Sequence, residues 1–312
     1  MALVLMIIIA VGLIQSSFVI SSLQSLFSKQ KKKKILIQKL LGILQVTPIL
    51  VLLASEIAFF FLVYLPAEVA KPFSSLEGLF YVVIACYLWL NMVFNYLAAL
   101  LLSPGYPEKL QELEKDGLLD EDVQTFCNKC DRIRDRDTHH CSTCYSCVQM
   151  MSHHCPLTNN CVGLNNFSYF YLFLFYCSLG LVFAAFLTFR PFKACMIGTP
   201  SLFGYTQGKC KDLGEYAVMF VPVMFMLVFM VLLFAGHTFL LILDMALIDF
   251  LRIFQNKKSF RSFVVLLLQE TFQRPKLRFR KLFFYRREKW WNFLLPSFNE
   301  IPELLPPDLF LV

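Results

Sequence analysis

The chain has 312 residues, of which 57% are apolar and 16% are charged, and its net charge is +7. Ordinary soluble domains have roughly 45–50% apolar and about 25% charged residues. The apolar residues here, 34 phenylalanines among them, fall in unbroken blocks and do not alternate with polar residues. This pattern excludes a soluble globular enzyme, a disordered chain and a secreted disulfide scaffold, and it argues against a β-barrel. It predicts an all-α multi-pass membrane protein.

Four apolar blocks are long enough to cross a bilayer as helices, which takes about 20 residues each. They are residues 40–65, 78–102, 168–189 and 216–243. A fifth uncharged stretch, residues 1–27, carries several Ser and Gln residues in its second half, and it either spans the membrane or lies along its surface. We therefore divide the chain into an N-terminal apolar segment with a basic run (1–39), two pairs of transmembrane helices (40–102 and 168–244), a Cys-rich domain (103–167) and a basic tail (245–312).

The basic residues predict the orientation, because lysine and arginine are retained on the cytoplasmic side of a membrane. If residues 28–39, 103–167 and the tail from Met245 are cytoplasmic, that side holds 24 of the 29 basic residues. We expect both ends of the four-helix bundle, and the Cys-rich domain, to face the cytoplasm. We interpret the basic run 29–34 and the cluster 274–289 as contacts to anionic lipid headgroups. A nucleic-acid partner is disfavoured.

The Cys-rich domain holds seven of the eleven cysteines and four of the five histidines, all between positions 127 and 161. Cytoplasmic thiols stay reduced, so this density favours metal binding over a disulfide framework. Paired Cys-x2-Cys units with intervening histidines match the tetrahedral coordination of zinc by thiolate and imidazole. Two closed zinc sites need eight ligands. Three of the eleven Cys and His residues therefore remain for another role.

Between Cys147 and Cys161 the chain carries the sequence Ser152-His153-His154-Cys155, in which an imidazole stands two residues before a thiol. An imidazole beside a thiol can take its proton, and the resulting thiolate can attack an acyl carbonyl. The alternative is that all these residues bind metal, or that one histidine only hydrogen-bonds a ligand. The residues by themselves leave both interpretations open.

From Phe126 to about Phe173 the chain resembles the DHHC-type zinc-finger protein S-acyltransferases, or palmitoyltransferases. It is more loosely similar to their four-helix layout from about residue 40 to 250. The shared pattern is Cys-x2-Cys, His-Cys-x2-Cys-x2-Cys-Val, His-His-Cys-Pro and then Asn-Cys-Val-Gly. The resemblance implies two structural Zn²⁺ ions. Their ligands would be Cys127, Cys130, His140 and Cys147 for one ion, and Cys141, Cys144, His154 and Cys161 for the other.

The resemblance also implies an activity, protein S-palmitoyltransferase. Cys155 would take a long-chain acyl group from acyl-CoA, such as palmitoyl-CoA, and pass it to cysteines of membrane-associated substrate proteins. His153 would be the base that takes the proton of Cys155. Family members are typical of the endoplasmic reticulum and Golgi, so we expect one of these membranes.

The largest departure from the family is Ser152, which stands where the family has Asp. A carboxylate there would fix the imidazole tautomer, and loss of the equivalent carboxylate in a serine protease lowers turnover roughly ten-thousand-fold. A cysteine nucleophile depends less on such a carboxylate than a serine does, because a few per cent of the thiol is already thiolate at neutral pH. The Ser152 hydroxyl can also still accept a hydrogen bond from His153. We expect a divergent but active enzyme; the alternative is a catalytically weak or inactive pseudoenzyme that acts as a membrane scaffold.

The sequence also departs from the family pattern at several other positions. Leu157 replaces the family's Trp, the turn at residues 103–105 keeps Pro and Gly but lacks the family's acid, and Asp249 is the one residue kept of a TTxE motif at positions 246–249. Asn91 and Asn95 lie four apart in one predicted span, where we expect interhelical hydrogen bonds. His237 lies near the cytoplasmic end of the last span, from which it could support the Cys-rich domain.

Overall fold

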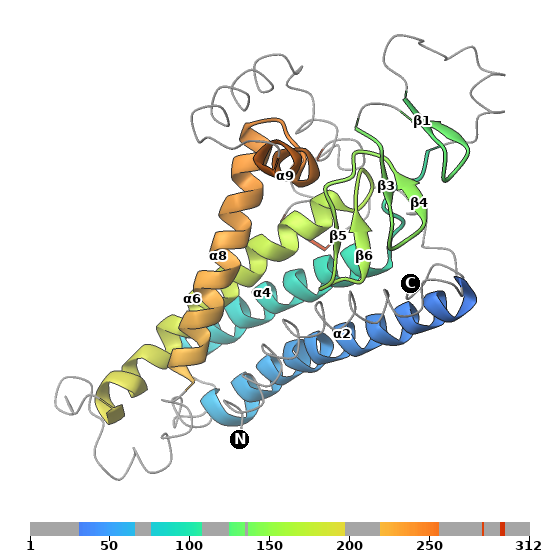
Figure 1. The fold of residues 1–312 in the computed structure, drawn as a ribbon. Helices are drawn as coiled ribbons and strands as arrows, with labels where there is room; N and C mark the ends of the chain where they lie inside the picture. Colours follow the sequence, from blue (N-terminus) through green and yellow to red (C-terminus); the bar gives the residue numbers. More distant parts are fainter. Residues whose placement is uncertain are drawn as a thin grey trace. The chain divides into compact units, whose positions relative to one another are not determined.

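The computed structural model describes residues 31–65, 76–107, 125–134, 137–196, 219–255, 283 and 294–296. The helices in these ranges are α2 (Lys31–Phe59), the π-helical turn η1 (Phe60–Tyr64), α4 (Leu76–Leu101), α6 (Phe167–Met196), α8 (Phe220–Ile242) and α9 (Leu247–Gln255) (Figure 1). The strands are β1 (Thr125–Cys127), β2 (Arg132–Arg134), β3 (His139–Cys141), β4 (Ser146–Val148), β5 (His153–Cys155) and β6 (Asn160–Val162). The stretch 1–27 and, apart from Phe283, the basic cluster 274–289 lie outside the described residues.

Four of these helices are long and apolar enough to cross a membrane: Leu44–Leu62, Gly78–Leu101, Phe167–Phe189 and Phe220–Ile242. The four predicted spans are thereby confirmed, with ends that shift by a few residues. Helix α2 begins at Lys31, before its apolar part, because lysine, leucine and glutamine are good helix formers even where they are too polar for a bilayer. The chain is a multi-pass membrane protein of predominantly helical fold.

The chain forms two compact units, whose boundaries cut across the long helices. One unit consists of Met1–Leu23, Gln45–Phe94 and Phe173–Phe234, and we call it the helical unit. The other consists of Gln24–Leu44, Asn95–Leu172 and Ala235–Val312, and it contains all six strands and α9. We call it the cysteine unit.

The helical unit is held together by aromatic side chains from neighbouring helices. The rings of Tyr81 and Phe183 lie 6.2 Å apart, and those of Phe175 and Phe234 lie 5.8 Å apart. The indole N–H of Trp89 in α4 donates to the carbonyl oxygen of Leu53 in α2 at 2.8 Å. A polar N–H inside a bilayer needs such a partner, because no water is there to replace it.

The strands of the cysteine unit form three separate antiparallel hairpins, β1 with β2, β3 with β4 and β5 with β6 (Figure 1). Each strand has three residues, and among the described residues a small apolar cluster of Cys141, Val148, Met151 and Cys161 joins the β3–β4 and β5–β6 hairpins. Backbone with positive φ at Asp131 (52°), Tyr145 (55°) and Asn159 (43°) accompanies the tight turns. Hairpins this short do not bury enough surface to be stable alone, so they need another source of stability.

Candidate functional site

The first of two Cys/His groups joins the β1–β2 and β3–β4 hairpins. The ligand atoms of Cys127, Cys130, His140 and Cys147 all lie within 4.8 Å of one another. The Cys-x2-Cys turn brings its two thiols together, because the N–H of Cys130 donates to the Cys127 carbonyl at 3.2 Å. His140 and Cys147 lie directly opposite each other in the β3–β4 ladder. His140 Nδ1 lies 3.1 Å from Cys130 Sγ, which points that nitrogen into the group.

The second group joins the β3–β4 and β5–β6 hairpins in the same way. It consists of Cys141, Cys144, His154 and Cys161, with ligand atoms again within 4.8 Å of one another. His154 and Cys161 lie opposite each other in the β5–β6 ladder. His154 Nδ1 lies 3.4 Å from Cys144 Sγ and 3.6 Å from Cys161 Sγ. Adjacent residues of β3 thus serve different groups, which links all three hairpins.

Both groups have the donor chemistry of a structural zinc site, three thiols and one imidazole in a closed cluster. Three thiolates this close repel one another unless a cation lies among them. The groups can therefore hold metal ions, and they contain the same eight residues that the resemblance implies as ligands. The remaining Cys and His residues of the block are His139, His153 and Cys155.

Cys155 ends β5, and its side chain is 3% exposed. Side chains two apart on a strand point to the same face, so His153 and Cys155 share one face of β5 while His154 points to the opposite face, toward the second group. On the other side of His153, its Nδ1 lies 3.2 Å from the hydroxyl oxygen of Ser152. Ser152 and His153 are thus in contact, Cys155 shares the strand face of His153, and none of the three belongs to the two metal-binding groups.

The thiol and the imidazole are both neutral in the resting site. Burial lowers the pKa of His153 to about 3, and the neighbouring His237 and His154 act in the same direction. Burial raises the pKa of the Cys155 thiol, while the backbone and hydroxyl groups of Thr158 and the backbone of Leu157 oppose that rise by hydrogen bonding. A neutral imidazole is a free base. Both shifts favour the neutral forms, so the two side chains form no standing thiolate–imidazolium ion pair, and burial makes His153 a weak base.

The ring of His153 is held by side chains from two helices. Its centroid lies 5.1 Å from that of Phe170 in α6 and 5.3 Å from that of His237 in α8. Phe170 and His237 also pack against each other at 5.1 Å. His237, which is buried, therefore contacts the Cys-rich domain, and it does so at the predicted base.

The β5–β6 hairpin is fastened to the end of α4. The last four carbonyls of a helix have no partner within it, and the side-chain amide of Asn160 donates to those of Ala99 at 3.1 Å and Leu102 at 2.9 Å. Asn166 donates to the carbonyl of Cys161 at 2.8 Å and accepts the N–H of Gly163 at 2.9 Å. These bonds position the turn that follows Cys155.

Helix α9 also contacts the site, at Ser152 and His139. The N–H of Ile248 donates to the carbonyl of Ser152 at 3.2 Å. Asp249 is buried, and its Oδ1 lies 3.5 Å from Nε2 of His139. Asp249, the one residue kept of the family's TTxE motif, therefore lies beside His139, which belongs to neither metal-binding group. We interpret this contact as support for the backbone at Ser152.

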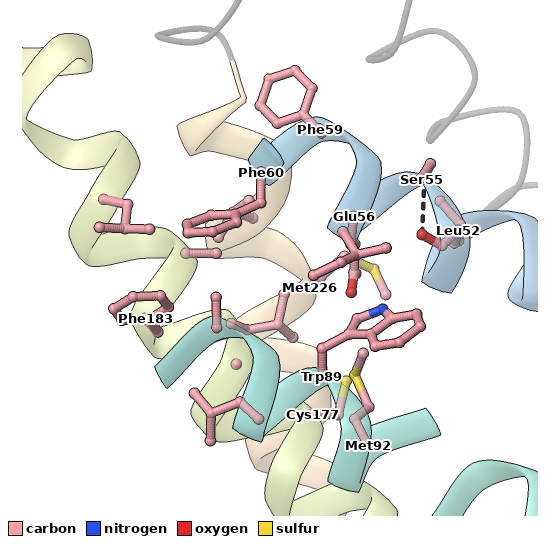
Figure 2. A pocket seen from close by; sticks show the side chains of 18 of the residues that line it. Leu52, Ser55, Glu56, Phe59, Phe60, Trp89, Met92, Cys177, Phe183 and Met226 are labelled. Carbon is pink, nitrogen blue, oxygen red and sulfur yellow. Dashed lines mark hydrogen bonds between the residues drawn. The ribbon is translucent and has the colours of Figure 1, made fainter. Parts of the chain in front are cut away.

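The helical unit contains a cavity of about 300 Å³, within the range of small-molecule sites. Its lining comes from α2, η1, α4, α6, Met219 and α8, and Figure 2 shows Trp89, Phe60, Phe183 and Met226 around it. The lining is almost entirely apolar, with Ser55, Glu56, Cys177 and Thr188 as its polar members. Such a cavity suits a hydrocarbon chain.

Three residues at the site were missed by sequence reasoning. Tyr96 is fully buried and donates from its hydroxyl to the carbonyl of Leu157 at 2.9 Å; a tyrosine near the end of a span was the available signal. Thr158 is fully buried beside Cys155, and its place three residues after the thiol could have pointed to it. Phe283 packs on Phe167 and Tyr171 at 6.0 and 5.2 Å; the stretch 283–294 faintly resembles the family's C-terminal aromatic motif, but this likeness does not predict the contact.

Comparison with known proteins gives one consistent family. Residues 120–253 match the family model "DHHC palmitoyltransferase". Palmitoyltransferase ZDHHC16 of Bos taurus and that of Homo sapiens are each 34% identical to this chain over 152 residues, which cover 49% of the chain and 38% of the relative. A probable protein S-acyltransferase 14 of Arabidopsis thaliana is 30% identical over 165 residues, covering 46% of the chain and 51% of that protein. The matched part of this chain thus spans about half or less of the length of these relatives.

Proposed function

We propose that the chain is a protein S-acyltransferase, because residues 120–253 match the family model "DHHC palmitoyltransferase". It would transfer a long-chain acyl group, such as palmitoyl, from acyl-CoA to cysteines of membrane-associated proteins. The observation that carries the proposal is Cys155, a buried thiol on the same strand face as His153 and outside both Cys/His groups.

In the first step the Cys155 sulfur attacks the thioester carbonyl of acyl-CoA. His153 takes the thiol proton, and Ser152 accepts a hydrogen bond from its Nδ1–H, which keeps the Nε2 lone pair free. A bond forms between Sγ and the acyl carbon, and the bond from that carbon to the CoA sulfur breaks. The CoA thiolate leaves with the proton that His153 returns. The product is an acyl thioester on Cys155.

In the second step a cysteine of the substrate protein attacks that thioester. His153 takes the proton of the incoming thiol, the acyl carbon bonds to the new sulfur, and its bond to Cys155 Sγ breaks. The released Cys155 thiolate regains the proton from His153. Neither step consumes an oxidant or a reductant, so the site needs only the two thiols and one base.

The two Cys/His groups would each hold one Zn²⁺, with ligands Cys127, Cys130, His140 and Cys147 in one and Cys141, Cys144, His154 and Cys161 in the other. Bound zinc supplies folding free energy to a segment with little apolar core. His154 lies between His153 and Cys155 on β5, so zinc binding by His154 would hold both reacting residues in place.

We further propose that the Cys-rich domain, residues 103–167, faces the cytoplasm of the endoplasmic reticulum or Golgi. The distribution of 24 of 29 basic residues supports this orientation. Cys195, near the opposite end of α6, is disulfide-bonded, as suits an oxidising compartment on the other side. The basic run 29–34 and the cluster 274–289 would bind anionic lipid headgroups.

A second candidate function is a membrane scaffold on an acyltransferase frame. The observation that favours it is Ser152, whose hydroxyl replaces a carboxylate and cannot balance the charge of a protonated His153. A scaffold protein would retain both metal-binding groups but would form no acyl-enzyme intermediate. The presence of a thioester on Cys155 separates the two functions.

The test is labelling of cells with an alkyne analogue of palmitate. We expect the wild type to carry label that hydroxylamine removes, and Cys155→Ala to carry none. Cys86→Ala is the matched control, because Cys86 is a free cysteine that contributes to neither group. If the wild type and both variants are expressed equally and none is labelled, the enzyme proposal is wrong.

A further inference from the structure

Helix α8 ends in a turn that separates it from α9 (Figure 1). The N–H of Asp244 donates to the carbonyl of Leu241 at 3.1 Å, and Asp244 has a positive φ of 56°. The N–H of Met245 donates to the carbonyl of Leu240 at 2.9 Å. These two bonds form a Schellman motif, which terminates an α-helix. Helix α9 therefore begins as a new helix only a few residues after the membrane-spanning stretch Phe220–Ile242.

One side of α9 is apolar. Leu247, Phe250, Leu251 and Phe254 recur at the three- and four-residue spacing that puts side chains on one face of a helix, and we call these four residues the α9 stripe. Leu251 and Phe254 are both exposed, Phe254 to 62%. Neighbouring apolar side chains that remain exposed indicate a surface that meets another molecule or a membrane.

Another side of α9 is fixed to the Cys-rich domain. Asp249 is buried, and its Oδ1 lies 3.5 Å from His139 Nε2. The N–H of Ile248 donates to the carbonyl of Ser152 at 3.2 Å. These contacts set how the helix is rotated about its own axis. Because Asp249 lies nearly opposite the α9 stripe at 3.6 residues per turn, the stripe points away from His139.

The α9 stripe continues the lipid-facing surface of α8. Phe239 and Ile242, in the last turns of that membrane-spanning helix, are exposed, Ile242 to 70%. The rings of Phe239 and Phe250 lie 6.5 Å apart, which joins the two surfaces. The sequence after α9 is basic, with three Lys and Arg residues among positions 256–261. Basic residues next to an apolar helix face favour the anionic surface of a bilayer.

We propose that α9 is an interfacial helix, which lies in the headgroup region of the bilayer with Leu251 and Phe254 among the acyl chains. A helix of this kind buries its apolar face about 5–10 Å into the boundary between headgroups and acyl chains. Through Ile248 and Asp249 it holds the backbone at Ser152 at a fixed depth relative to the lipid. This surface goes beyond the acyltransferase function and does not depend on it.

The test introduces a tryptophan at single positions of α9 and measures its quenching by lipid. The purified full chain is reconstituted in nanodiscs of phosphatidylcholine and phosphatidylserine, with or without bromine on the acyl chains of the phosphatidylcholine. Phe254→Trp and Leu251→Trp place the indole on the α9 stripe. Arg252→Trp is the matched control, because Arg252 is exposed and lies off the stripe. The fluorescence of the wild type, which has three tryptophans, is subtracted.

We expect bromine to quench the added indole about threefold more strongly at positions 254 and 251 than at position 252, because the two sides of a helix lie about 10 Å apart. Two positions on the stripe keep the test valid if one variant misfolds. Equal quenching at the stripe and at position 252 would overturn the proposal. Quenching at none of the three positions would also overturn it and would mean that a protein surface, such as a second copy of the chain, covers the stripe.

Discussion

Ser152 sets how well His153 can carry a proton. Its hydroxyl lies 3.2 Å from His153 Nδ1, and Ser152 is only 2% exposed. A hydroxyl can orient the ring but carries no charge to match an imidazolium. The site therefore keeps the geometry of a base and its orienting group while lacking the charge that would stabilise the protonated base.

We predict that Ser152→Asp accelerates acyl-enzyme formation by about five- to tenfold. A hydrogen bond to a charged group is worth about 1 kcal/mol more than one between neutral groups, and 1.4 kcal/mol is a factor of ten in rate. The rate of palmitate incorporation into purified protein measures this. Ser152→Ala is the counterpart variant and should be slower than the wild type. A slower Ser152→Asp with unchanged expression would mean that His153 does not become protonated during the reaction.

Residue roles were predictable where a residue belongs to a fixed pattern. The eight Cys and His residues of the two groups, and the remaining pair His153 and Cys155, follow from spacing and the family resemblance. Tyr96 belongs to no such pattern, because its hydrogen bond to the carbonyl of Leu157 joins residues far apart in the sequence and forms only on folding. Side-chain burial of this kind has no signature in the local sequence.

Among the secondary-structure elements, the long helices were predictable from composition alone. Within the described residues, unbroken apolar runs predicted the four spans and their approximate ends, and α2 begins earlier where good helix formers extend it. The three hairpins were not predictable in detail. Strands of three residues have too few positions to show an alternating pattern, and their turns follow the Cys-x2-Cys units instead.

Helix α6 offers a test of the cavity in the helical unit. Gly180 lines the cavity, and a Cβ added there would meet no atom within 4 Å. We expect the hydrocarbon chain of the substrate to bind in this cavity. Gly180→Leu should then fill space without displacing the backbone and shift labelling several-fold from an alkyne stearate toward an alkyne myristate.

Gly236→Leu in α8 is the matched control, since a Cβ there also meets nothing within 4 Å and Gly236 does not line the cavity. Its chain-length preference should equal that of the wild type. Should Gly180→Leu keep the wild-type preference at normal expression, the cavity does not hold the acyl chain.

In the molecule as a whole, bound metal ions would stabilise the three hairpins. The two groups share β3 through the neighbours His140 and Cys141, so each ion would fasten two hairpins and both would be needed for all three. The hairpins carry the reacting residues but little apolar core of their own. Metal content and folding should therefore change together.

We predict two Zn²⁺ per chain by elemental analysis of the purified protein. Cys130→Ser and Cys144→Ser should each lower that content, to about one ion or fewer, and lower the thermal unfolding temperature in detergent. Cys86→Ser, a free cysteine outside both groups, should retain both ions. Wild-type protein that folds and labels with palmitate without zinc would contradict the structural role.

The most direct test of the central claim is the mass of the purified protein after incubation with palmitoyl-CoA and no protein substrate. The account predicts one added palmitoyl group per chain, located on the peptide that contains Cys155 and removed by neutral hydroxylamine. Cys155→Ala should show no such adduct while retaining two Zn²⁺. A zinc-loaded, folded wild type that gains no palmitoyl group, or gains it at another cysteine, would contradict the assignment of Cys155 as the acyl-transferring nucleophile.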